Sequence, residues 1–175
     1  MTDYKNPENY QVVYSAEDIQ KRLQELARQI DEDYRDKELI LIAMLKGSLP
    51  LLCDLARYLS KSVLIEVIAI SPLNGNQQKG IEVIRDINLD ISNRHVLVLE
   101  DIVRTGLTTN FMLQHLQKYN PASLELFTLL FNRDQLLIDL EPRYIGFDID
   151  YTRLIGYGMD HHEQARDLPF IAKLQ

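Results

Sequence analysis

The sequence has few of the features that crosslink a chain, anchor it in a membrane or bind it to nucleic acid. It contains one cysteine, Cys53, which excludes an intrachain disulfide framework, and the apolar helix-like segment around it predicts a packing role. No apolar run reaches the roughly 18 residues that a membrane span needs. The net charge of −7 disfavours binding along a DNA or RNA backbone, although a small anion needs only local donors.

The N-terminal residues 1–6 are polar and contain no apolar signal-peptide segment. We therefore expect a cytoplasmic protein. With 175 residues and a hydrophobic fraction of 46%, spread in short runs, the chain is expected to form a single domain over residues 1–175.

Short apolar runs alternate with helical patterns along the chain. Ser15–Asp18 fits a capping box, and apolar residues follow at helical spacing as far as Ile30. Leu39–Met44 predicts a buried strand, and Pro50 fits the first turn of a helix that ends near Leu59. Further strands are expected at 63–70, 81–84, 96–99, 124–131, 144–147 and 154–155. This alternation predicts an α/β fold with a parallel sheet and right-handed crossovers.

The most informative segment is residues 95–109. Four apolar residues predict a buried strand, and two acids, Glu100 and Asp101, follow where this strand is expected to end. A small turn rich in hydroxyls comes next and leads into a helical pattern. The carboxyl ends of strands face the ligand crevice in an open α/β sheet. A turn at a helix N-terminus suits a phosphate, and two acids suit ribose hydroxyls or a phosphate-bound Mg²⁺.

This segment resembles the phosphoribosyl-pyrophosphate (PRPP) signature of type I phosphoribosyltransferases. Four more segments extend the resemblance to hypoxanthine-guanine phosphoribosyltransferases over almost the whole chain from about residue 10: 45–48, the loop at about 71–80, 144–147, and 156–160 with 166–169. The resemblance implies a type I phosphoribosyltransferase fold, in which helices flank a parallel core sheet. A small hood would form from the N- and C-terminal segments, and the loop at about 71–80 would be flexible.

The resemblance also implies an activity. The protein would transfer 5-phosphoribose from PRPP to hypoxanthine or guanine, giving IMP or GMP and pyrophosphate, with Mg²⁺ as cofactor. It would act in purine salvage as a homodimer or homotetramer.

Site residues follow from the same resemblance. Lys46 and Gly47 would form the pyrophosphate loop, where the family often has a non-proline cis peptide, and Arg166 would also contact the pyrophosphate. Glu100 and Asp101 would hold the ribose hydroxyls and, with Asp160, face the metal. The turn that wraps the 5′-phosphate would comprise Thr105, Gly106, Leu107 and Thr108. Taken singly, Lys46, Asp160 and Arg166 are equally compatible with ordinary surface charges.

Four positions depart from the family pattern, and all lie where the base would be held or the site sealed. Arg104 replaces an aspartate beside purine N7, and an arginine cannot take up a proton there. It either supplies positive charge to a phosphate or carbonyl or points into solvent. Asn132 replaces a lysine that donates to the purine oxygen, Arg153 replaces a stacking aromatic residue before Leu154, and Pro72 replaces a tyrosine.

Three functions remain open at this point. The first is the purine phosphoribosyltransferase, and the second is a non-catalytic PRPP- or nucleotide-binding regulator. The third is a phosphoribosyltransferase for another base. The run Asp160–Glu163 contains two histidines between two acids, but adjacent residues rarely converge on one metal ion, so we expect a solvated loop.

Overall fold

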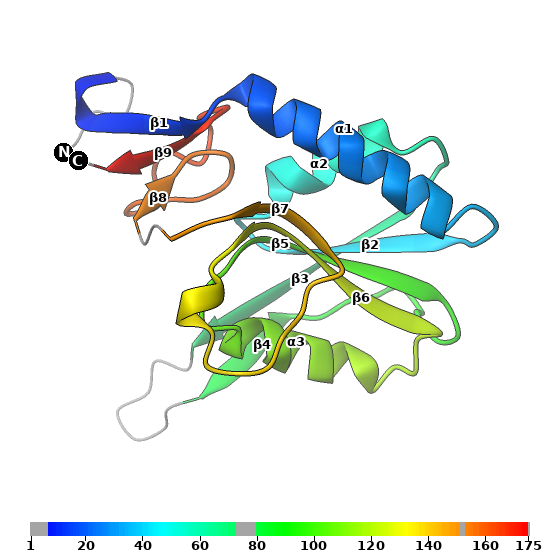
Figure 1. Ribbon diagram of the computed structural model, residues 1–175. Helices are drawn as coiled ribbons and strands as arrows, with labels where there is room; N and C mark the ends of the chain where they lie inside the picture. The colour runs from blue at the N-terminus through cyan, green and yellow to red at the C-terminus, as the bar shows by residue number, and fades with distance from the viewer. Residues whose placement is uncertain (1–6, 73–79, 151–152, 175) are drawn as a thin grey trace.

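The computed structural model describes residues 7–72, 80–150 and 153–174 and contains two sheets (Figure 1). The larger has six strands in the order β4-β3-β2-β5-β6-β7, and the smaller has three in the order β1-β9-β8. The strands of the larger sheet are β2 (Leu39–Met44), β3 (Leu64–Pro72), β4 (Ile81–Arg85), β5 (His95–Val103), β6 (Ser123–Phe131) and β7 (Tyr144–Asp148). The smaller sheet contains β1 (Tyr10–Tyr14), β8 (Leu154–Ile155) and β9 (Ile171–Leu174).

The helices cover both faces of the larger sheet. Figure 1 shows α1 (Ala16–Asp33) and α2 (Leu49–Tyr58) on one face and α3 (Leu107–Gln117) on the other. Two short 3-10 helices complete the elements, η1 (Pro7–Asn9) and η2 (Arg133–Gln135). Because side chains alternate along a strand, each central strand supplies both cores. Leu97 and Leu99 pack toward α1 and α2, whereas Val96 and Val98 pack toward α3.

The predicted fold class is confirmed, with two corrections to the strands. Strands β2, β3, β5, β6 and β7 are parallel, but β4 runs antiparallel to β3, so the sheet is mixed. Strand β5 continues to Val103, past the two acids, because Ile102 and Val103 pair with the apolar end of β6. Glu100 and Asp101 therefore lie within the strand rather than after it.

The smaller sheet joins the two ends of the described chain. Tyr10 of β1 lies opposite Leu174 of β9, and Ile155 of β8 lies opposite Ala172. The sequence analysis did not predict strands β1 and β9, because each is short and pairs with a segment from the far end of the sequence. The predicted loop at about 71–80 overlaps the end of β3 at residues 71–72, and its part at 73–79 lies outside the described residues.

The expected packing role of Cys53 is wrong. Helix α2 buries Leu51, Leu52 and Leu55, and Cys53 lies on the other side of the helix, where it is exposed. The cause is the helical turn of about 100° per residue, which takes position 53 away from the stripe that faces the sheet.

Helix α1 is attached to the edge strand β7 at two places: Asp33 accepts a hydrogen bond of 2.6 Å from the Tyr144 hydroxyl, and Arg22 bonds the strand backbone. Arg22 donates from Nε to the carbonyl of Gly146 and from Nη2 to the carbonyl of Ile145, both at 2.8 Å. These carbonyls belong to β7, an edge strand whose outer side has no strand partner. The guanidinium thus satisfies backbone acceptors that would otherwise need water.

We expect the Arg22→Met variant to lose about 1–2 kcal/mol of unfolding free energy, because two charge-assisted hydrogen bonds to a partly solvated guanidinium disappear. Urea denaturation measures this loss. Arg28→Met on the same helix is the matched control, since Arg28 is exposed and forms no ion pair or hydrogen bond with the described residues. Equal stabilities for the two variants would contradict the assignment.

Candidate functional site

The predicted site residues gather at the C-terminal edge of the larger sheet. Loops after β2, β5 and β6 meet there, and the segment 156–166 that follows β8 lies over them. A crevice at this edge is expected because the helices leave the sheet on opposite faces. The smaller sheet lies beside this edge (Figure 1).

Glu100 is the most deeply buried acid of the site, with 1% of its surface exposed. Its Oε1 accepts a hydrogen bond of 2.9 Å from the Thr109 hydroxyl on α3. Burial, together with the charge of Asp101, raises the pKa of Glu100 to about 8. Glu100 is therefore largely protonated at neutral pH. The sequence places Thr109 in the hydroxyl-rich turn but does not predict its partner. The spacing of nine residues from Glu100 to Thr109, which runs from strand through turn to helix, is the signal that pairs them.

Asp101 lies beside the loop after β2. Burial raises its pKa, whereas backbone N–H groups and the positive charges of Arg166 and Arg104 act in the opposite direction. A Cβ on Gly47 would stand 2.0 Å from Asp101 Oδ2, so only glycine lets this carboxylate pack against the loop. The expected cis peptide is present between Leu45 and Lys46.

A second glycine brings the loop of residues 156–166, called the upper loop below, into contact with the loop after β2. Gly158 has a φ of +96°, and a Cβ there would stand 1.8 Å from the carbonyl oxygen of Gly47. Both the positive φ and the close approach therefore require glycine. Tyr157 fixes the same loop on α2, because its hydroxyl donates to Asp54 Oδ2 at 2.8 Å.

The structure brings Lys46, Asp160 and Arg166 together. It adds Glu163, which was not predicted as a site residue. Arg166 Nη2 lies 2.8 Å from Asp160 Oδ1 and 3.5 Å from Glu163 Oε2, and Lys46 Nζ lies 2.8 Å from the same Glu163 oxygen. The expected solvated loop at 160–163 agrees with the structure, in which Glu163 is 67% exposed, and its two acids in addition pair with Lys46 and Arg166. Spacing gave no signal for this, since Lys46 and Glu163 are 117 residues apart.

Two buried polar atoms without a partner among the described residues lie in this region. They are Ser48 Oγ, in the loop that begins α2, and Arg166 Nε. Buried polar atoms in proteins are almost always hydrogen-bonded. Unused donors next to Lys46 and Gly47 suit a ligand rich in acceptor oxygens, such as a phosphate.

The turn before α3 has the geometry of an anion site. Gly106 takes the N-cap position with a φ of +78°, and no side chain caps the helix. The first N–H groups of a helix have no partner within it, so those after Gly106 are available to a ligand. Thr105 and Leu107 are exposed and Thr108 is half-buried, which leaves the turn open to solvent.

The residues predicted to face a base differ in their exposure and in whether they already have a hydrogen-bond or ion-pair partner. Arg104 and Arg153 are exposed, and neither pairs with a carboxylate in the part of the chain that the structure describes. Asn132 is 1% exposed, and its Oδ1 already accepts from the Gln135 N–H, capping η2. Its neighbour Arg133 pairs with Asp148 at 2.8 Å. Leu154 is 3% exposed at the start of β8.

No cluster of three His, Cys, Asp or Glu side chains occurs among the described residues, so they form no all-protein metal cage. The carboxylates present, Asp101, Glu100 and Asp160, are oxygen donors of the kind that Mg²⁺ takes. Mg²⁺ is usually held by one or two carboxylates together with substrate phosphates. The site fits that mode of binding.

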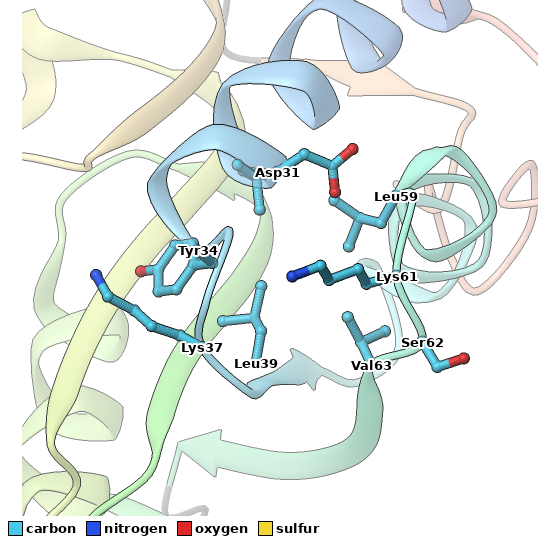
Figure 2. Close-up of a pocket in the computed structure, with 9 residues that line it drawn as sticks. Asp31, Tyr34, Lys37, Leu39, Leu59, Lys61, Ser62 and Val63 are labelled. Atoms are coloured by element: carbon cyan, nitrogen blue, oxygen red, sulfur yellow. The ribbon is translucent and has the colours of Figure 1, made fainter.

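A small cavity elsewhere in the molecule lies away from the site (Figure 2). It is lined by residues such as Tyr34, Leu39 and Val63, at the N-terminal ends of β2 and β3. Its volume of about 20 Å³ admits little more than one water molecule. The candidate site residues lie at the opposite, C-terminal edge of the sheet.

Known proteins resemble this chain over most of its length. A family model described as the phosphoribosyl transferase domain matches residues 10–162. Hypoxanthine-guanine phosphoribosyltransferase of Mycobacterium tuberculosis is 37% identical over 171 residues, covering 93% of this chain and 85% of the relative. Hypoxanthine-guanine-xanthine phosphoribosyltransferase of Tritrichomonas foetus is 38% identical over 167 residues, covering 94% of this chain and 91% of the relative.

Solved structures agree with these relatives. A hypoxanthine-guanine phosphoribosyltransferase from Bacillus anthracis superposes with a TM-score of 0.89 at 35% identity, covering 95% of this chain and 99% of that one. A hypoxanthine phosphoribosyltransferase from Staphylococcus aureus gives a TM-score of 0.92 at 32% identity, covering 100% and 96%. Among the described residues, no helix has the length and apolar character to cross a membrane.

The raised pKa of Glu100 predicts a pH-dependent stability. The folded protein binds more protons than the unfolded chain between the ordinary pKa of 4.5 and the raised value of about 8. Unfolding free energy should therefore fall as pH rises through this window, by linkage. Glu100→Gln should reduce this fall, of which the raised pKa of Asp101 accounts for a further part, and be more stable than wild type at pH 9, by on the order of 2–4 kcal/mol.

Urea denaturation at pH 5 and pH 9 measures the difference between the two proteins. Glu38→Gln removes one negative charge from an exposed carboxylate and is the control. If wild type and Glu100→Gln changed in parallel with pH, Glu100 would not carry the effect.

Proposed function

This chain belongs to the phosphoribosyltransferase family, in its hypoxanthine-guanine branch, and we propose that it transfers 5-phosphoribose from PRPP to an oxopurine base. The products are a purine nucleotide and pyrophosphate, so the reaction serves purine salvage. A cytoplasmic location and assembly into a homodimer or homotetramer are part of the proposal. The observation that carries it is the convergence, at one sheet edge, of the acid pair, the open turn before α3 and the cations Lys46 and Arg166.

Each part of PRPP has a matching group in this arrangement. The turn of residues 105–108 binds the 5′-phosphate through N–H and hydroxyl donors. Asp101 accepts from a ribose hydroxyl, while protonated Glu100 donates to one, since its pKa of about 8 keeps the proton at neutral pH. The charged groups of Lys46 and Arg166 hold the pyrophosphate.

Phosphoribosyltransferases of this family generally use Mg²⁺. Asp101 and Asp160 are the carboxylates proposed to hold it, and Glu100 would join them on giving up its proton to a bound metal. When bound, Mg²⁺ would supply positive charge that offsets the charge on the pyrophosphate. The protein's own contribution to the departure of pyrophosphate is the charge of Lys46 and Arg166. The base then forms a bond to C1′ as the bond from C1′ to the pyrophosphate oxygen breaks, and the proton that the ring nitrogen loses passes to solvent, since Arg104 cannot accept it.

A second candidate, transfer to a base other than hypoxanthine or guanine, is favoured by one observation. Arg104 and Arg153 present two unpaired guanidinium groups at the base side, and the Asn132 amide oxygen is engaged in capping η2. Guanidinium groups favour bases with more acceptor atoms, and xanthine has one carbonyl more than hypoxanthine. Arg104 cannot serve as a proton acceptor for either base.

The proposal is tested by nucleotide formation from PRPP and Mg²⁺ with hypoxanthine, guanine or xanthine. We expect wild type to form nucleotide. Arg104→Asp should raise kcat/KM with hypoxanthine by up to about 10²–10⁴-fold, the usual contribution of general acid–base catalysis. Arg28→Asp makes the same charge change far from the site and should leave the rate unchanged.

Turnover with xanthine alone would select the second candidate. A wild type that is inactive with every base, beside an active Arg104→Asp variant, would leave PRPP binding or regulation as the function. Inactivity of both proteins would contradict the transferase proposal.

A further inference from the structure

The two cations assigned to the pyrophosphate are bridged by one carboxylate oxygen of the protein itself. Glu163 Oε2 lies 2.8 Å from Lys46 Nζ and 3.5 Å from Arg166 Nη2. These three side chains come from segments that are more than 110 residues apart, the loop after β2 and the loop between β8 and β9. The carboxylate thus lies in the position that suits an anion bound by both cations.

The upper loop holds Glu163 in this place. Its backbone has a φ of +62°, and its N–H donates to Asp160 Oδ2 at 2.9 Å. Arg166 is fixed independently, because Nη1 donates to the carbonyl of Gly158 at 2.8 Å. Lys46 and Arg166 also lower the pKa of Glu163, so its carboxylate is ionised at neutral pH.

We infer that Glu163 is an internal counter-ion that occupies the leaving-group site and must be displaced when pyrophosphate binds. The inference rests on the proposed function, because that function places pyrophosphate against Lys46 and Arg166. Both partners are largely exposed, at 63% for Lys46 and 67% for Glu163, so the exchange needs no unfolding.

The need to displace Glu163 from Lys46 and Arg166 weakens pyrophosphate binding by a limited factor. Exposed ion pairs are each worth up to about a fivefold change in an equilibrium, and Glu163 makes two. A carboxylate near the bound phosphates also repels them. Glu163 thereby favours release of the product, and its removal should tighten binding.

Isothermal titration of the full-length protein with sodium pyrophosphate, with and without MgCl₂, tests this inference. We expect Glu163→Gln to lower the Kd for pyrophosphate by about 3–10-fold and to lower its inhibition constant against PRPP similarly. Glutamine keeps the size of the side chain and the N–H to Asp160. Glu38→Gln is the matched control, since it breaks an exposed ion pair of 2.9 Å with Arg94 at the other end of the sheet. Circular dichroism confirms that each variant is folded.

A double-mutant cycle adds a second measurement. Because Lys46 is one of the cations that Glu163 neutralises, the gain from Glu163→Gln should be smaller in a Lys46→Gln background. Unchanged or weaker pyrophosphate binding by Glu163→Gln, in a wild type that forms nucleotide, would overturn the inference and leave the proposed function intact. A wild type that neither forms nucleotide nor binds PRPP would overturn the proposed function, and the inference with it.

Discussion

The contact on which the site depends is the close approach of two backbone segments, Gly158 against the carbonyl oxygen of Gly47. It joins the smaller sheet, made from both ends of the chain, to the loop after β2. Without it, Arg166 and Lys46 would belong to separate surfaces. Because a Cβ at residue 158 would stand 1.8 Å from that oxygen, the contact is available only to glycine. Tyr157 and Asp54 support it from α2 with a side-chain hydrogen bond.

The same edge of the sheet contains a carboxyl group in an unfavourable place. Glu100 lies within β5 directly after the buried residues Val96–Leu99, and its one hydrogen-bond partner in the described part of the chain is the Thr109 hydroxyl. A group of this kind is poorly explained by stability, since burial of a carboxyl raises its pKa and disfavours its charged form. Its position next to Asp101 and the turn before α3 is the one in which the proposed function would use it, against a ribose hydroxyl. The rest of the β5 core, with Val96–Leu99 fully buried, supplies the stability that tolerates it.

Sequence patterns over a few neighbouring residues predicted those elements that depend on neighbouring residues alone. The capping box at Ser15, the buried run of β2 and the turn after β5 are each set by neighbouring residues, and the structure contains all three. Strands β1 and β9 are different, because Tyr10 pairs with Leu174 at the other end of the chain. Glu163 was missed for the same reason, since only the folded chain brings it to Lys46. The resemblance supplied Asp160 and Arg166, which no periodicity would have selected.

Charge explains how an acidic protein can offer a site for a polyanion. With a net charge of −7, the overall field repels pyrophosphate, so affinity depends on a few cations at short range. Four charged side chains gather there, Lys46 and Arg166 against Asp160 and Glu163, and their charges sum to zero. These four side chains are electrostatically balanced, and under the proposed function an incoming phosphate would replace one anion by another. Arg104 and Arg153 form no ion pair within 4 Å among the described residues, although the charge of Arg104 acts on the buried Asp101. Under the proposed function, this leaves positive charge on the side of the site that would face the base.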